Sequence, residues 1–176
     1  SFHVGPYLLQ EAIGSVMLER DHKLTNTAII KLNDDWDTLD ETHRSIYIDK
    51  HELYEANGDN DETEMMALEA LEELFKALES RDVNKVLRYL DLESFAKVSA
   101  LEKLYGTNHS TSGDNVKYIF DSTTGQFRCA FRAEGQIRTL PKILSRDTLQ
   151  LDNYQINPIF KFLDKHKPFR EKETKY

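Results

Sequence analysis

Tyr89-Leu-Asp-Leu-Glu-Ser-Phe-Ala-Lys97 begins the stretch of sequence that decides the fold, and this stretch continues to Glu134. Asp91 is a favourable N-cap for a helix over residues 92–105, and Gly106 is a favourable stop after it. The apolar side chains of this helix recur every three positions and are expected to face the core: Phe95, Val98, Leu101 and Leu104. The helix is therefore predicted to deliver the chain to the polar loop that follows.

A β-hairpin is predicted directly after that loop. Residues 115–121 alternate between two faces, which is typical of a strand. One of these faces carries Val116, Tyr118 and Phe120. Ser122-Thr-Thr-Gly125 supplies a turn, and residues 126–132 form the returning strand.

Polar side chains gather around this hairpin in a pattern that suits phosphoryl transfer. Asn115 and Glu134 fall on opposite predicted strands, and they could meet if the strands pair around Thr123-Thr124. An amide oxygen and a carboxylate are hard ligands that suit a divalent cation. His109 and Asp114, in the loop, are the nearby candidates for handling the proton of a nucleophilic hydroxyl. Phosphoryl transfer needs this positioning and charge stabilisation more than it needs covalent chemistry.

Each of these residues also has a plainer interpretation. Asn115 could simply cap a turn, His109 could be a surface loop residue, and Glu134 could be a loop carboxylate. The sequence contains no glycine-rich phosphate loop, no Gly-x-Ser-x-Gly elbow and no dinucleotide-binding fingerprint. Both interpretations stay open at this level.

The chain has one cysteine, Cys129, so neither an intramolecular disulfide nor a cysteine-based zinc site can form within it. Cys129 lies among apolar neighbours with no base beside it in the sequence, so we expect a buried, inert thiol. The histidines are scattered and form no pair at metal-ligand spacing, which argues against zinc.

The longest predicted helix covers residues 62–80, and Asp61 or Thr63 is expected to cap its start. Its apolar positions recur at spacings of three and four: Met65, Leu68, Leu71, Leu74, Phe75 and Leu78. Other elements are expected from similar patterns: a helix over 12–21, a strand over 27–32, a weak strand or helix around 46–48, a turn at Asn57-Gly58, a helix over 83–90, and a helix from Asn157-Pro158 to about His166. We therefore predict one α+β domain.

The formal net charge is −8, which argues against nonspecific nucleic-acid binding. Most of the acidic excess lies between Asp34 and Glu64, where it predicts a solvated surface, a cation site or an acidic docking face. An EF-hand is rejected because its glycine and its distal glutamate are missing. No apolar run approaches the roughly 18 residues that a membrane span needs.

Three blocks of the sequence resemble the spore-coat protein H (CotH) kinase-like family. Gly5-Pro-Tyr-Leu-Leu-Gln-Glu-Ala-Ile13 is similar to the family's Gly-x-Tyr-x-Leu-x-Glu segment, and residues 90–97 with His109 are similar to the helix that leads to its catalytic loop. Asn115-Val-Lys-Tyr118, with the turn at 121–125, resembles the family's Asn-x-x-x-Tyr strand and Asp-x-x-Thr-Gly hairpin. Two further segments also resemble the helices beyond the site: Asn157-Pro-Ile-Phe160 and Pro168-Phe-Arg170.

The resemblance implies an atypical protein-kinase-like fold, mainly the helical larger lobe with a β-hairpin at the site. It implies phosphorylation of protein Ser/Thr with ATP and Mg²⁺ or Mn²⁺, a protein substrate or binding partner, and an extracellular, cell-surface or spore-coat location. The resemblance implies that Tyr7, Leu9 and Glu11 belong to the connector whose backbone meets adenine. It also implies that Asn115 and Glu134 are metal ligands.

The sequence departs from the family pattern in two ways. Glu134 falls at or next to the position where the family has a metal-binding aspartate. The extra methylene of glutamate displaces its carboxylate, and such a misplacement can lower the rate roughly 10²-fold. The family's phosphate-binding lysine lies upstream of the segment at Gly5, where this chain begins. We therefore expect residues 1–176 to be a single domain that lacks most of the smaller lobe and does not transfer phosphate by itself.

Two alternatives to a kinase-like catalytic domain stay open. The first is a non-catalytic binding or structural module of the same fold, such as a pseudokinase in a surface or multiprotein assembly. The second is an unrelated helical scaffold organised by the helix over 62–80. The three hypotheses differ in whether the chain binds metal and nucleotide.

Overall fold

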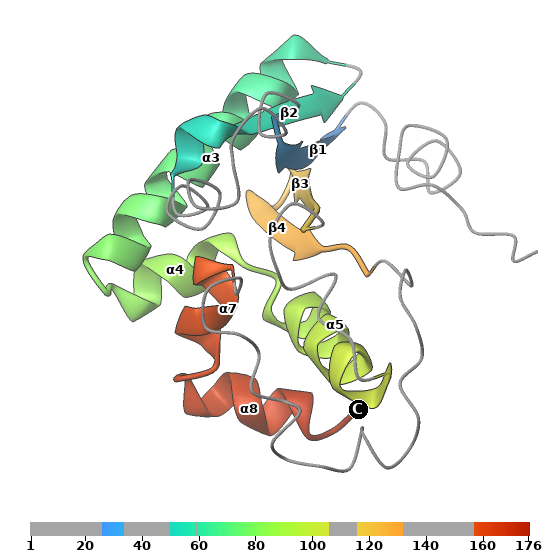
Figure 1. Cartoon of the computed structure of the whole chain (residues 1–176). Helices are drawn as coiled ribbons and strands as arrows, with labels where there is room; N and C mark the ends of the chain where they lie inside the picture. Colours follow the sequence, from blue (N-terminus) through green and yellow to red (C-terminus); the bar gives the residue numbers. More distant parts are fainter. Residues whose placement is uncertain (1–25, 34–49, 59, 106–115, 132–156) are drawn as a thin grey trace, which may run out of the picture.

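The computed structural model describes residues 26–33, 50–58, 60–105, 116–131 and 157–176. These residues form an α+β fold, in which helices pack against a four-stranded antiparallel sheet of order β2-β1-β3-β4 (Figure 1). The predicted fold class is thus confirmed. The strands are β1 (Thr27–Leu32), β2 (Tyr54–Gly58), β3 (Tyr118–Asp121) and β4 (Gln126–Cys129).

β1 lies in the middle of the sheet. It pairs with β2 from Ala28↔Gly58 to Leu32↔Tyr54, and with β3 from Thr27↔Asp121 to Ile30↔Tyr118. Nearly all of its side chains are buried, as expected for an apolar, β-branched strand with a neighbour on each side. The predicted strand at 27–32 is confirmed with these bounds.

The predicted turn at Asn57-Gly58 is wrong, because both residues belong to the β1–β2 ladder. Asn57 pairs with Ile29, and Gly58 pairs with Ala28. A Cβ on Gly58 would lie 3.0 Å from the carbonyl oxygen of Thr27. Glycine is used here for the close approach of two strands and not for a turn.

The longest helix, α3 (Asp61–Glu79), agrees with its prediction within one residue at each end. The predicted caps are wrong: the N-cap is Asn60, whose side chain accepts a hydrogen bond from the Glu62 amide at 2.8 Å. Met65 and Leu68 are 61% and 38% exposed, so the buried face does not follow the large apolar residues alone. It includes smaller ones: Thr63, Ala67, Leu71, Leu74, Phe75 and Ala77.

Two helices connect α3 to the hairpin: α4 (Val83–Tyr89) and α5 (Leu92–Tyr105). Asp91 caps α5 as predicted, since its carboxylate accepts from the amides of Glu93 and Ser94 at 3.2 and 3.3 Å. Leu104 was expected to face the core but is 63% exposed. Leu104 lies nine residues after buried Phe95, which is about two and a half helical turns, so the two residues lie on opposite faces of α5.

The helix predicted from Asn157-Pro158 to about His166 is the shorter α7 (Pro158–Leu163), and a separate helix, α8 (Lys167–Glu173), follows the predicted end. Asn157 opens α7 as expected, with its side chain accepting from the Ile159 amide at 3.0 Å. Pro168 falls in the first turn of α8. A proline cannot continue the hydrogen bonding of a preceding helix, which explains the break.

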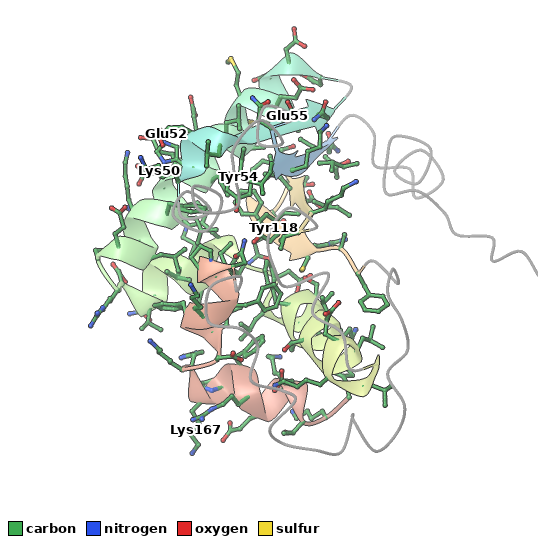
Figure 2. The ribbon with its side chains drawn as sticks, in the orientation of Figure 1. Lys50, Glu52, Tyr54, Glu55, Tyr118 and Lys167 are labelled. Atoms are coloured by element: carbon green, nitrogen blue, oxygen red, sulfur yellow. The ribbon has the colours of Figure 1, made fainter. Side chains whose placement is uncertain are left out.

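Aromatic rings link the sheet to the helices. Phe95 of α5 stacks on Tyr118 of β3 at a centroid separation of 5.8 Å and contacts Phe160 of α7 at 5.4 Å. Tyr54 of β2 contacts Phe75 of α3 at 5.8 Å. Figure 2 shows Tyr54 and Tyr118 near the middle of the molecule, where these elements meet.

A short 3₁₀ helix, η3 (His51–Leu53), precedes β2. Within the described ranges, no helix has both the length and the apolar character required to cross a bilayer.

Candidate functional site at the β3–β4 hairpin

The turn of the hairpin is organised by Asp121. Its carboxylate accepts from the amide of Thr123 at 3.0 Å and from the hydroxyl of the same residue. Its carbonyl accepts from the Gly125 amide at 2.8 Å, and Gly125 has a φ of 66°, which glycine adopts without strain. Asp121 pairs with Gln126, so the turn is centred on Thr123-Thr124 as the sequence predicts.

The hairpin is fixed to the start of α5 by hydrogen bonds. The Asp91 amide donates to the carbonyl of Phe127 at 2.9 Å, beside an isolated bridge between Leu90 and Phe127. The Cys129 amide donates to the Ser94 hydroxyl at 3.1 Å, and this hydroxyl donates to the carbonyl of Asp91 at 3.0 Å. The sequence order of helix followed by hairpin therefore produces one connected unit.

Arg128 adds charged contacts to this unit. Its guanidinium lies 3.5 Å from the Asp91 carboxylate and 3.8 Å from the Asp121 carboxylate. Because Arg128 is partly exposed, these pairs are worth only a modest stabilisation, on the order of 1 kcal/mol or less. Their role is to orient the turn relative to the helix.

At the end opposite the turn, strand pairing continues beyond the named strands. The Ala130 amide donates to the carbonyl of Lys117 at 3.0 Å. Val116 and Ala130 are both buried here. Val116 and Ala130 therefore lie at the same end of the hairpin.

None of the candidate site residues predicted from the sequence falls within the described ranges. They are His109, Asp114, Asn115, Glu134, Tyr7, Leu9 and Glu11. Their convergence on a metal ion and a nucleotide stays a prediction. Among the residues that the structure describes, no group of three or more His, Cys, Asp or Glu side chains is arranged to hold a metal ion.

A buried polar cluster lies behind the hairpin, and sequence analysis did not foresee it. The Asn157 side-chain amide donates to the Tyr54 hydroxyl at 3.3 Å. The Tyr118 hydroxyl, fully buried, has no well-formed hydrogen bond among the described residues, although the Asn157 amide lies near it. The alternating pattern of the strand identified Tyr118 as a core residue, but no local signal pairs residues so distant in sequence.

Burial determines the chemistry of the two titratable groups in this region. It raises the pKa of Tyr118 well above its usual value, and the nearby Tyr54 and Cys129 add to the effect, which the Asn157 amide opposes. Burial also raises the pKa of the Cys129 thiol, with a smaller contribution from the Glu102 carboxylate. Both groups stay neutral near pH 7, so neither is a nucleophile, and the predicted inert thiol is confirmed as buried.

Comparison with known proteins gave no matching family model and no similar curated protein or solved structure.

Proposed function

We propose that this chain is a CotH-kinase-like domain whose metal and nucleotide site is built on the segments that flank the β3–β4 hairpin. The main support is the hydrogen bond between Ala130 and Lys117, which joins the two strands at the end opposite the turn. Asn115 directly precedes this paired region, and Glu134 follows Phe131 by three residues. Paired strands lie about 4.8 Å apart, so the paired residues nearest to Asn115 and Glu134 in the sequence are neighbours in the structure.

In this proposal the residues have distinct roles. Asn115 and Glu134 hold Mg²⁺ or Mn²⁺, and the backbone of the segment with Tyr7, Leu9 and Glu11 meets the adenine of ATP. A protein Ser/Thr hydroxyl would attack the γ-phosphorus of ATP, and the bond between this phosphorus and the oxygen of the departing ADP would break. His109 or Asp114 would accept the proton of the hydroxyl.

The rigid attachment of the hairpin to α5 also supports the proposal. Metal and phosphate sites need ligands held to within about 0.5 Å, which requires a supporting framework. The hydrogen bonds from Asp91 to Phe127 and from Cys129 to Ser94 provide such a framework in the hairpin and α5.

A second candidate is a non-catalytic binding module of the same fold, and Glu134 is the residue that favours it. A glutamate in place of the family's aspartate displaces the carboxylate by one methylene. Because a small misplacement costs roughly 10²-fold in rate, the chain can bind metal and nucleotide with little or no phosphoryl transfer.

Thermal unfolding with Mg²⁺ and ATP tests the proposal. ATP at about 100 times its Kd adds roughly 2.7 kcal/mol to stability, which raises the Tm of a chain of this size by about 5–10 °C. We expect Asn115→Ala to abolish this shift. The matched control is Asn84→Ala, at an exposed position of α4, which should retain the full shift.

The outcomes separate the hypotheses. A shift that requires metal, ATP and Asn115, together with phosphate transfer from radiolabelled ATP, supports an active kinase. The same shift without transfer supports the binding module. No shift with either ligand contradicts the nucleotide site and leaves two hypotheses, a module of the same fold that binds no nucleotide and the helical scaffold.

A further inference from the structure

A pocket of about 650 Å³ lies on the helical side of the molecule, away from the β3–β4 hairpin. Its walls come from the C-terminal end of α3, the α3–α4 turn, and α7 with the turn that follows it (Figure 1). Phe75 and Phe162 are among its apolar lining residues. A cavity of this size and apolar character suits a small organic molecule.

The pocket combines this apolar wall with an excess of positive charge. Arg81, Lys161 and Lys165 line it, and within the described part of the chain none of the three makes an ion pair. Glu79 is the one acid among the pocket's lining residues, so the formal charge of the lining is +2 with histidine neutral. This concentration of cations stands out in a chain whose net charge is −8.

Arg81 occupies a backbone conformation that is unfavourable for an arginine. Its φ is 56°, the left-handed region, and within the described ranges it is the only non-glycine residue with a positive φ. The turn has the two hydrogen bonds of a Schellman motif, from Arg81 to Leu78 at 3.1 Å and from Asp82 to Ala77 at 3.0 Å. Glycine is the usual residue at this position. A strained residue at a pocket is reason to infer that its side chain has a function there.

His166 provides a second, independent observation. Its Nε2 atom is buried without a hydrogen-bond partner among the described residues, although the residue lines the pocket. His166 is also the N-cap of α8, yet its side chain makes no capping hydrogen bond. An unsatisfied buried nitrogen calls for an explanation, and a ligand in the pocket supplies its partner when the imidazole turns this nitrogen toward the pocket.

We propose that this pocket binds a phosphate monoester whose ester group is apolar or aromatic. A phosphate monoester is close to a dianion at neutral pH, which matches the charge of the lining. Arg81, Lys161 and Lys165 hold the phosphate oxygens, and the arginine fork suits two of them at once. The ester group packs against the apolar wall, and His166 contributes a hydrogen bond.

Binding of phenyl phosphate, followed by calorimetry and by NMR spectra of the full chain, tests this inference. EDTA is present throughout, so the metal site of the proposed kinase-like function does not contribute. We expect saturable binding with shifts in the imidazole signals of His166. Inorganic phosphate alone and benzyl alcohol alone should each bind more weakly, because each offers one half of the interaction.

Single substitutions locate the site. Arg81→Gly and Lys165→Ala should each weaken binding about tenfold, the usual loss for a charge-assisted hydrogen bond. Lys167→Ala is the matched control, because this lysine, labelled on α8 in Figure 2, does not line the pocket and pairs with Glu171. It should leave binding unchanged.

Three results would overturn the inference. The first is no saturable binding with a Kd below about 1 mM. The second is an affinity for inorganic phosphate equal to that for phenyl phosphate. The third is binding that Arg81→Gly leaves intact while the spectrum of the variant shows the native fold. Loss of binding in this variant cannot be attributed to unfolding, because glycine should raise its melting temperature.

Discussion

Replacing Arg81 by glycine should stabilise the protein, although it removes a large side chain. A left-handed conformation costs an L-residue about 1–2 kcal/mol, and glycine avoids this cost. Glycine loses about 0.5–1 kcal/mol more chain entropy on folding, which offsets part of the gain. The net increase in the free energy of unfolding is therefore about 0.5–1 kcal/mol. For a chain of this size that corresponds to a rise of about 1–4 °C in Tm.

Urea denaturation followed by circular dichroism at 222 nm measures this difference, with thermal unfolding as a second readout. The adjacent residue provides a matched control, because Ser80 has a φ of −74° in the right-handed region. Ser80→Gly should destabilise the protein by at least about 0.5–1 kcal/mol, because glycine there relieves no strain and increases the entropy of the unfolded chain. It also removes the hydrogen bond that the Ser80 hydroxyl donates to the Ala77 carbonyl at 3.2 Å. The same substitution at neighbouring positions thus has opposite predicted signs. If Arg81→Gly unfolds at lower urea than the wild type, the assignment of strain to this residue is wrong.

Three further predictions test other parts of the molecule. Tyr118→Phe should leave stability unchanged or raise it by about 1 kcal/mol, because it removes a buried hydroxyl that has no well-formed hydrogen bond among the described residues. Tyr54→Phe loses a hydrogen bond to Asn157 and should lower stability by about 1 kcal/mol. Chemical denaturation compares the two variants. Asn60→Ala should destabilise α3 by about 1 kcal/mol in the same assay, and an equal effect of truncating Asp61 would contradict the observed cap. If the proposed site is weakened by its longer carboxylate, Glu134→Asp should enlarge the rise in Tm that Mg²⁺ and ATP produce, and an unchanged rise in a natively folded variant would contradict this explanation.

Local patterns were sufficient to predict most of the described elements. β1 is identified by its β-branched residues, and α3 by apolar residues at spacings of three and four. Asp91 identifies the start of α5, and the turn residues after β3 identify the hairpin. Each of these signals depends on residues close in sequence, so no knowledge of tertiary contacts is needed.

The errors arose where distant contacts decide the outcome. Gly58 serves a close approach to β1, and this function cannot be distinguished from a turn without knowing its strand partner. Leu104 was misplaced because a spacing of three drifts around a helix whose period is 3.6 residues. The hydrogen bond between Tyr54 and Asn157 joins residues that are 103 positions apart, and no sequence pattern predicts it.

The candidate site was predicted from residue chemistry and family resemblance, and its residues lie outside the described ranges. The proposed metal and proton-handling residues precede Val116 or follow Phe131 in the sequence, and the proposed connector comprises Tyr7, Leu9 and Glu11. The pocket at Arg81 was not predicted at all, because the cations that line it are brought together from separate helices by folding.

The central position of β1 has a consequence for how the protein is made. During synthesis β1 and β2 emerge first, with α3 directly after them, and these contacts are local. The other edge of β1 stays open until β3 has been translated, and long-range strand pairing is slow to form. An apolar strand with an unpaired edge is a template for association with other chains. A nascent chain that pauses before Tyr118 should therefore be prone to aggregate, and this tendency should fall once β3 has emerged and paired with β1.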